Sequence, residues 1–261
     1  MGLYARRWWL EENSPTLRRA ERRQVRSILA RQRRDGSLGS LPATIGRLYA
    51  LQLLRREAGH ESDKALDWLW ETGQPPQSRR ASDGALYHDL LFRMKRGEPA
   101  RLNRMPGTPF GRGCAGFIKT GAGILLASRF GRGREPRVTR AIRCLDDIGE
   151  ARGGLWCTPA CSVNLLLGLA AHPEAARSRS VVRAVRALAR LQTESGSWPG
   201  LPFVPTFSAL AGLDLREART QVRRALPLVR RTQNRDGSWS RGPNREFATY
   251  LVVQAMRAIE S

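Results

Sequence analysis

Two cysteines that stand four residues apart carry the most distinctive chemistry in the sequence. Cys157 and Cys161 flank Thr158 and Pro159 in "LWCTPACSVNLLLGLAA". Thr158 is a good helix N-cap and Pro159 a good first helical residue, so Cys157 precedes the cap and Cys161 is the third residue of the helix. Backbone N–H groups and the helix dipole stabilise thiolates at such an end. The pattern favours metal binding or thiol redox chemistry.

A third cysteine and a histidine complete a candidate metal site. Cys114 follows a repeat glycine as Leu155 follows the next one, so we expect it at the corresponding end of the neighbouring unit, near the other two cysteines. Zinc would take a fourth protein ligand or keep an open water site. His88, with Asp89 beside it, is our candidate for that ligand. An iron–sulfur cluster is the less favoured alternative, because its usual compact cysteine spacing is missing.

Other roles remain open for these thiols. Small, apolar cysteines also fill tight helix crossings. A disulfide in the cavity is a further alternative, although four cysteines in a chain expected in the cytosol are more naturally thiols, ligands or core residues. Cys144, between "AIR" and "LDD" on a polar helix, is expected to be a core residue.

The loop "GRGCAG" at 111–116 has the letters of a dinucleotide-binding motif without its context. No strand precedes it and no βαβ unit surrounds it, so we do not expect it to bind a dinucleotide. Its glycines would still let a ligand approach, and Arg112 and Lys119 would then meet a diphosphate at the N-terminus of the following helix. The alternative is a solvated loop.

A repeat of about forty residues positions these groups. Its glycines are Gly36, Gly73, Gly113, Gly154, Gly196 and Gly237, at spacings of 37, 40, 41, 42 and 41 residues. Trp156, Trp198 and Trp239 keep step with the last three glycines. We expect each glycine to end one helix and permit the turn that reverses the chain.

Each unit is expected to pair a polar outer helix with an apolar inner one. Arginine-rich amphipathic segments, such as 180–192 and 220–233, precede the glycine, and segments such as "FATYLVVQAMRAI" follow it. Nothing reads as a strand, so the fold class is all-α, with 1–14 as an N-terminal segment and 15–261 as a single domain. Residues 98–113 predict a loop where the third outer helix is expected.

The sequence around the glycines resembles a known repeat. Gln233 with "DGSW", Gln192 with "SGSW" and Gln32 with "DGSLG" resemble the QW repeats of squalene-hopene cyclases and protein prenyltransferase β subunits. The stretch from "CAGFIKTGAG" to "LLLGLAAHP" is similar to bacterial prenyltransferase-like or squalene-cyclase-like proteins. The resemblance implies an α/α toroid, or barrel, of about five to six helix pairs. Its inner helices would line a central cavity, and its Gln and Trp would brace neighbouring outer helix ends.

The catalytic motifs of those families are missing. No DxDD acid is found, since "CLDDIGE" at 144–150 has only two adjacent acids, and neither DDxxD nor the Asp-x-Cys of the prenyltransferase zinc site occurs. "WC" followed by Pro and an apolar helix is also similar to the lanthipeptide cyclases, which are zinc-containing toroids, but their Cys-His-Gly motif is absent. A repeat without its catalytic acid is a scaffold whose chemistry can have changed.

Three functional hypotheses follow. The first is a terpenoid cyclase- or prenyltransferase-like protein that handles an isoprenoid or other apolar ligand in its cavity, with a cysteine-ligated metal or an arginine-held diphosphate at the mouth. Phe203, Phe207, Phe247 and Tyr250, near the inner helix starts, are its candidate walls, although aromatics at helical spacing are also ordinary core. The second is a cyclase-like scaffold that binds lipid or a partner without turnover. The third is a non-catalytic basic helical repeat protein that binds nucleic acid, an anionic membrane or a protein partner.

Charge and hydropathy bear on partners and location. The chain has 45 Lys+Arg against 23 Asp+Glu, a formal net charge of +22, and nearly all of the excess is arginine. Such a surface neutralises phosphates, although a GC-rich genome also encodes an excess of arginine without any such function. No stretch reaches ~18 apolar residues and no signal-peptide core is present. We expect a cytoplasmic protein, with a peripheral membrane contact through Trp8 and Trp9 as an alternative.

Overall fold

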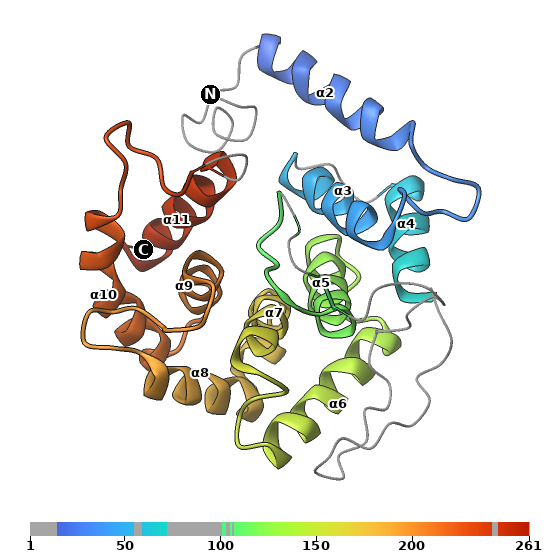
Figure 1. Ribbon diagram of the computed structural model, residues 1–261. Coiled ribbons are helices and arrows are strands. Elements are labelled where there is room, and N and C mark those ends of the chain that lie inside the picture. The colour runs from blue at the N-terminus through green and yellow to red at the C-terminus, as the bar shows by residue number, and fades with distance from the viewer. Residues whose placement is uncertain are drawn as a thin grey trace.

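A computed structural model of the chain is built from helices (Figure 1). It describes residues 15–54, 59–71, 101–102, 105, 107–241 and 245–260. In these ranges the ten α-helices are α2 (Pro15–Leu29), α3 (Leu41–Leu53), α4 (His60–Glu71), α5 (Ala115–Arg129), α6 (Pro136–Ala151), α7 (Pro159–Ala170), α8 (Arg179–Leu191), α9 (Phe203–Ala211), α10 (Arg216–Arg231) and α11 (Arg245–Glu260). A short 3-10 helix, η1 (Ala175–Arg177), lies between α7 and α8. The all-α prediction is confirmed.

Polar and apolar helices alternate along the chain, as predicted. The amphipathic helices α8 and α10 bury one apolar stripe each and expose their arginines. By contrast, α5 buries every residue from Phe117 to Ala127, and α7 buries every residue from Cys161 to Leu169. Figure 1 shows α5, α7 and α9 toward the middle of the molecule, with α6, α8 and α10 around them. The apolar helices therefore form an inner layer and the polar helices an outer one.

Two very short strands correct the prediction that nothing forms a strand. β1 (Arg101–Leu102) pairs antiparallel with β2 (Gly113–Cys114) and closes a loop that leads into α5. Two residues per strand are too few to leave an alternating pattern in the sequence. Residues 107–112 between them are not helical, which agrees with the loop predicted over 98–113.

Gly113 differs from the other described repeat glycines. α4 ends at Glu71, the next described helix is α5, and these two helices pack against each other. Gly113 lies in β2 and lacks the positive φ of the other described repeat glycines. Gly73 itself lies outside the described residues. The described helices form five outer–inner pairs, which agrees with the five to six predicted.

The repeated glutamine joins one pair to the next. Gln192 Nε2 donates to the carbonyl of Gly196 at 3.2 Å and to that of Gln221, on α10, at 2.8 Å. Gln32 Nε2 does the same at the first pair, donating to Gly36 at 3.0 Å and to Glu61, on α4, at 2.7 Å. One side-chain amide thus fixes its own turn and also anchors the following outer helix.

The repeated glycine is required by conformation and by space. Gly36, Gly154 and Gly196 have φ values of +87°, +106° and +85°, a region that L side chains rarely adopt. A Cβ at Gly196 would lie 2.3 Å from the carbonyl oxygen of Arg224, and one at Gly154 would lie 2.6 Å from that of Arg183. The turn therefore packs directly on the backbone of the next outer helix.

Candidate metal centre

Two glycines let the inner helices α5 and α7 cross in close contact. A Cβ on Gly121 of α5 would lie 2.1 Å from the carbonyl oxygen of Asn164. A Cβ on Gly168 of α7 would lie 2.3 Å from the carbonyl oxygen of Gly121. The two backbones touch because neither position carries a side chain, and the N-terminal ends of both helices come side by side.

Three cysteines meet where these two helices begin. Cys114 is the N-cap residue of α5, Cys157 precedes the N-cap of α7, and Cys161 is the third residue of α7. Their sulfur atoms all lie within 4.8 Å of one another. Cys161 is buried and the other two are half-buried. The predicted convergence of cysteines from neighbouring units is confirmed as a geometric fact.

The local turn that holds Cys161 is the one predicted from the sequence. Thr158 has the extended backbone of an N-cap residue, and its Oγ1 accepts a hydrogen bond from the Cys161 backbone N–H at 3.4 Å. Pro159 fills the first helical position, where no intrahelical N–H is needed. This cap fixes the phase of α7, so Cys161 faces the N-cap of α5.

The surroundings favour a thiolate at Cys161. Its pKa is lowered to about 5, first by a hydrogen bond from the Cys157 thiol, with burial opposing and the Thr158 hydroxyl assisting. The backbone N–H of Cys114 also donates to Cys161 Sγ at 3.3 Å. The pKa of Cys157 is raised, because its thiol proton is shared with Cys161 and because it is partly buried. Without metal, the Cys161 thiolate therefore accepts a hydrogen bond from the Cys157 thiol.

Asn164 holds the loop that carries Cys114 and was missed by the sequence analysis. Its Oδ1 accepts from the Gly111 N–H at 2.9 Å, and its Nδ2 donates to the Ala160 carbonyl at 3.2 Å and to that of Arg112 at 3.5 Å. The side chain is buried on α7. A lone amide in the apolar run "SVNLLLGLAA" was the signal, because a buried amide must find partners.

Gly113 completes this close packing. A Cβ there would lie 2.9 Å from Asn164 Nδ2 and 3.3 Å from Cys161 Sγ. Any larger residue would displace the sulfur or the amide that positions the loop. Gly113 thus allows the loop to pack closely on α7, whereas Gly36, Gly154 and Gly196 allow a turn with positive φ.

The cluster can hold a metal ion. In a tetrahedral zinc site with Zn–S bonds of about 2.3 Å, neighbouring sulfurs stand about 3.8 Å apart. Sulfurs within 4.8 Å of one another reach that spacing by side-chain adjustments of about 1 Å or less. Three soft thiolate donors suit zinc. His88 and its neighbour Asp89 lie outside the described residues, so this fourth ligand stays a prediction.

The predicted anion-binding pair is not brought together on one surface. Arg112 is exposed in the loop before β2, whereas Lys119 is fully buried in α5. Lysine is rarely buried without a partner, and Lys119 does make interactions there. In the described part of the chain, the short β pair around "GRGCAG" belongs to no βαβ unit, as expected.

The predicted aromatic wall residues form two groups. On α9, Phe207 is fully buried and stacks on Phe203 with centroids 6.0 Å apart. On α11, Phe247 and Tyr250 are half-buried with centroids also 6.0 Å apart. Phe247 meets Tyr49 of α3 edge-on, with ring centroids 5.8 Å apart. This contact links the first and last inner helices that the structure describes.

The remaining predictions concern the N-terminal segment and the membrane. Residues 1–14, with Trp8 and Trp9, lie outside the described residues. Among the helices that are described, none combines the length and the hydropathy needed to cross a bilayer.

Comparisons with known proteins inform the fold. No protein-family model matches the chain, and no curated protein matches it. A crystal structure of a protein from Actinoplanes is similar over 99% of this chain and 89% of that one, with a TM-score of 0.57 and 16% sequence identity. At that identity the similarity shows a shared helical fold and carries no activity across.

Proposed function

We propose that the protein is an α/α toroid enzyme in which Cys114, Cys157 and Cys161 hold a zinc ion beside a site for an apolar, isoprenoid-like substrate. The alternation of five outer and five inner helices supports the toroid. So does the contact between Tyr49 of α3 and Phe247 of α11, which brings the two ends of the inner layer together. A prenyltransferase- or cyclase-like ancestry is consistent with the way the repeated glutamines and glycines contact the next outer helix.

The observation that carries the proposal is the meeting of three thiols at two adjacent helix N-termini. A site with three protein ligands leaves one position for water or substrate, which is the arrangement of catalytic zinc. Bound zinc would supply Lewis-acid polarisation or an activated nucleophile. The chain's own contribution is the cap of α7, the Asn164 bonds to the loop and the N–H of Cys114, which hold the sulfurs before any metal arrives.

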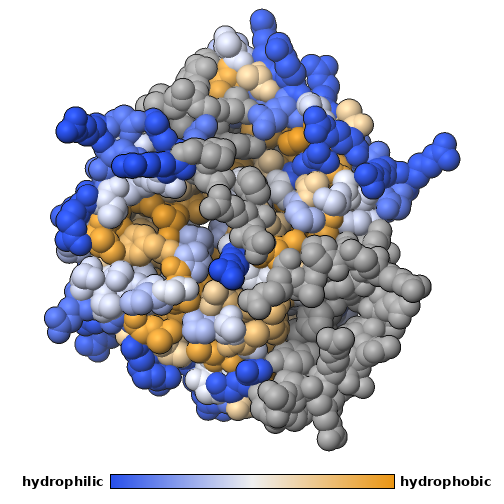
Figure 2. All heavy atoms as spheres, in the orientation of Figure 1, coloured by the Kyte–Doolittle hydropathy of each residue, from blue (hydrophilic) through white to orange (hydrophobic). Residues whose placement is uncertain are grey.

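Apolar surface near this centre supports an apolar substrate. Residues 201–205, which include the first turn of α9, are all half-buried. A Cβ on Gly111, in the loop held by Asn164, would meet Pro202 at 3.5 Å, so the start of α9 adjoins the cysteine loop. Figure 2 shows hydrophobic residues gathered over α9 and α11, with hydrophilic residues at the rim. The half-buried Phe203, Phe247 and Tyr250 would line such a site, and the fully buried Phe207 would support Phe203 by stacking on it.

Metal analysis tests the proposal. The protein is purified anaerobically and its metal content measured by plasma mass spectrometry, together with a C114A/C157A/C161A variant and a C144A control. Cys144 is a half-buried cysteine of α6 outside the cluster, so C144A controls for thiol loss. We expect one zinc per chain in the wild type and in C144A, and none in the triple variant. Absence of metal from the wild type, even after zinc is added, would contradict the proposal.

Substrate binding is tested separately. Farnesyl or geranylgeranyl diphosphate is titrated into the zinc-loaded wild type and into F203A/F207A and F247A/Y250A variants. We expect saturable binding that the aromatic substitutions weaken, with zinc content unchanged. Stoichiometric zinc without any binding of these compounds would keep the metal centre and reject the isoprenoid.

A thiol redox centre is the second candidate, favoured by the hydrogen bond between Cys157 and the Cys161 thiolate. A low-pKa thiolate beside a second thiol attacks disulfides readily. Reaction with oxidised glutathione would join Cys157 to Cys161 and release two reduced glutathione molecules. A zinc-free protein whose two cysteines equilibrate with glutathione would favour this candidate over the first.

A further inference from the structure

A basic groove lies on the outer surface between α2 and α3, away from the cysteine cluster. Its volume is about 550 Å³, and it is lined by Ala20, Arg23, Gln24, Ser27, Ile28, Arg31 and Arg47. Three guanidinium groups thus come from two helices and the turn between them. Grooves of this size accommodate several groups of a ligand.

Arg47 is a fixed donor in this groove. Its Nη1 donates to the backbone carbonyl of Leu38. A Cβ on Gly39 would lie 2.9 Å from that nitrogen, so the glycine leaves room for the guanidinium. Burial lowers the pKa of Arg47, and the nearby charges of Arg31 and Arg33 lower it further. An arginine surrounded by like charges is stabilised when an anion joins it.

No carboxylate neutralises these arginines within the described residues. The structure gives no ion pair to any of the three, and the nearby carboxylate of Asp35 accepts hydrogen bonds from Trp68 Nε1 and the Ser37 N–H. The groove between α8 and α10 differs, since its lining includes a carboxylate, Glu217, which pairs with Arg186 at 3.1 Å. The positive charge of the groove is therefore available to a ligand.

The basic surface continues along α2. This 15-residue helix has an exposed arginine at positions 18, 19, 22, 23 and 26, and buries only Leu17, Val25 and Ile28. At 1.5 Å per residue it is roughly 22 Å long. Figure 2 shows hydrophilic residues over this helix at the upper edge of the molecule. The surface could therefore follow several successive phosphates of a chain.

We infer that the groove between α2 and α3 binds the phosphate backbone of a nucleic-acid strand. Planar guanidiniums match phosphate oxygens, and a groove suits a linear polyanion better than a flat lipid surface. A membrane contact would also need apolar side chains to insert, and the one large hydrophobic residue that is exposed in the described ranges, Leu191, lies on α8. The groove lining has no aromatic residue for base stacking, so binding is independent of sequence.

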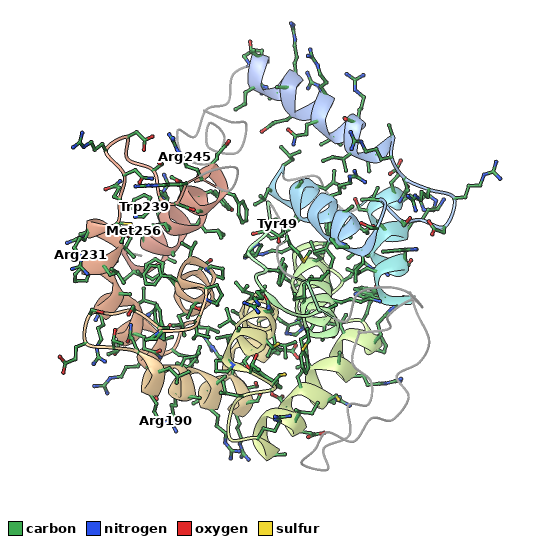
Figure 3. The ribbon with its side chains drawn as sticks, viewed as in Figure 1. Tyr49, Arg190, Arg231, Trp239, Arg245 and Met256 are labelled. Carbon is green, nitrogen blue, oxygen red and sulfur yellow. The ribbon has the colours of Figure 1, made fainter. Side chains whose placement is uncertain are left out.

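Charge-matched variants test this inference. Binding of a fluorescent oligothymidine of about 20 nucleotides is measured by anisotropy across a range of salt concentrations. R23Q/R31Q/R47Q removes the groove charges, and R179Q/R190Q/R231Q removes three exposed arginines from α8 and α10. Arg190 and Arg231 point away from the ribbon in Figure 3. We expect the groove variant alone to reduce the slope of log K against log salt by about 2.

Further arms separate the alternatives. R23E/R31E reverses two charges of the groove and should abolish binding of the oligonucleotide. It keeps Arg47 and its bond to the Leu38 carbonyl, so the α2–α3 turn should stay intact and the Tm should not change. Vesicles of phosphatidylglycerol serve as a second polyanion. The inference is overturned if both triple variants lose affinity equally, if the strand does not bind at low salt, or if vesicles bind and the strand does not. None of these results depends on the zinc content.

Discussion

Replacement of Gly121 by alanine tests the link between helix packing and the cysteine cluster. Alanine in the interior of a helix is ordinarily more stable than glycine by up to about 1 kcal/mol. Here the added Cβ would stand 2.1 Å from the carbonyl oxygen of Asn164 and 2.9 Å from its carbonyl carbon. Ordinary van der Waals contact begins at 3.4 Å, so α5 and α7 must separate locally by about 1.3 Å.

The clash should outweigh the helix propensity of alanine. Overpacking a close-packed interior costs typically 1–3 kcal/mol, and the obstacle here is backbone that no side-chain rotation can clear. We therefore expect G121A to lower the free energy of unfolding by about 2 kcal/mol, the upper part of that range less the alanine gain. For a chain of this size, that change corresponds to a drop in Tm of roughly 4–8 °C.

The same substitution should weaken metal retention. Cys114 begins α5, whereas Cys157 and Cys161 belong to the start of α7, so a separation of the helices separates the sulfurs. Metal–ligand distances tolerate only about 0.2 Å of error. G121A is compared with G212A in thermal unfolding and in zinc bound per chain. Gly212 ends α9 with an ordinary negative φ, and its Cβ would meet nothing closer than 3.6 Å.

We expect G212A to match the wild type in both measurements and G121A to fall in both. If G121A is as stable as G212A, the close crossing of α5 and α7 is not what the glycine secures. If G121A is destabilised yet keeps its zinc, the cysteines are positioned by the loop before α5 and the helix crossing is unimportant for them.

Three further predictions concern the repeated glutamine, the Asn164 bonds to the loop before Cys114, and the Cys161 thiolate. Q192A should lower the free energy of unfolding by about 1–3 kcal/mol in chemical denaturation, because the buried carbonyls of Gly196 and Gln221 lose their hydrogen-bond donor. Q233A should change the free energy of unfolding by less than about 0.5 kcal/mol, because Gln233 is exposed. N164A should release zinc to a chelator several times faster at unchanged helix content, since the loop before Cys114 loses its bonds; an unchanged rate would assign the loop's position to the β pair alone. In metal-free protein, the ultraviolet absorbance of the thiolate should persist as the pH falls and disappear only near pH 5, because the pKa of Cys161 lies below its ordinary value. The C161S variant should lack this absorbance. A transition near pH 9 would contradict the hydrogen bond between Cys157 and Cys161.

The sequence predicted the part of the site that depends on local rules. Thr158 and Pro159 define a helix start by capping chemistry alone, and that start fixes where Cys157 and Cys161 lie on α7. The convergence with Cys114 followed from the repeat, because successive inner helices begin at the same end of the fold. Both inferences needed only patterns within about forty residues.

What the sequence could not predict depends on contacts between distant segments. Lys119 was expected to meet a diphosphate, and whether a lysine is solvated or buried depends on helices packed around it, which no local pattern shows. The role of Asn164 rests on loop residues more than fifty positions earlier. Gly113 keeps the repeat spacing although it lies in β2 without a positive φ, because glycine positions alone do not give the φ values that distinguish a turn from a strand.

The last copy of the motif separates the roles of its residues. Trp239 Nε1 donates to the Val229 carbonyl at 2.7 Å, within its own helix pair, as Trp156 does to Leu145 at 2.6 Å. Gln233, unlike Gln192, is exposed, and the described structure gives its amide one acceptor, the Gly237 carbonyl at 2.8 Å. In these two copies the tryptophan stabilises a pair from within, whereas Trp198 Nε1 donates to Gln221 Oε1 on the next outer helix, α10, at 3.4 Å. The glutamine adds its second bond only where another outer helix follows. The same residue types therefore bond within a pair in some copies and between successive pairs in others, so the stability lost on substitution should depend on the copy for both Gln and Trp.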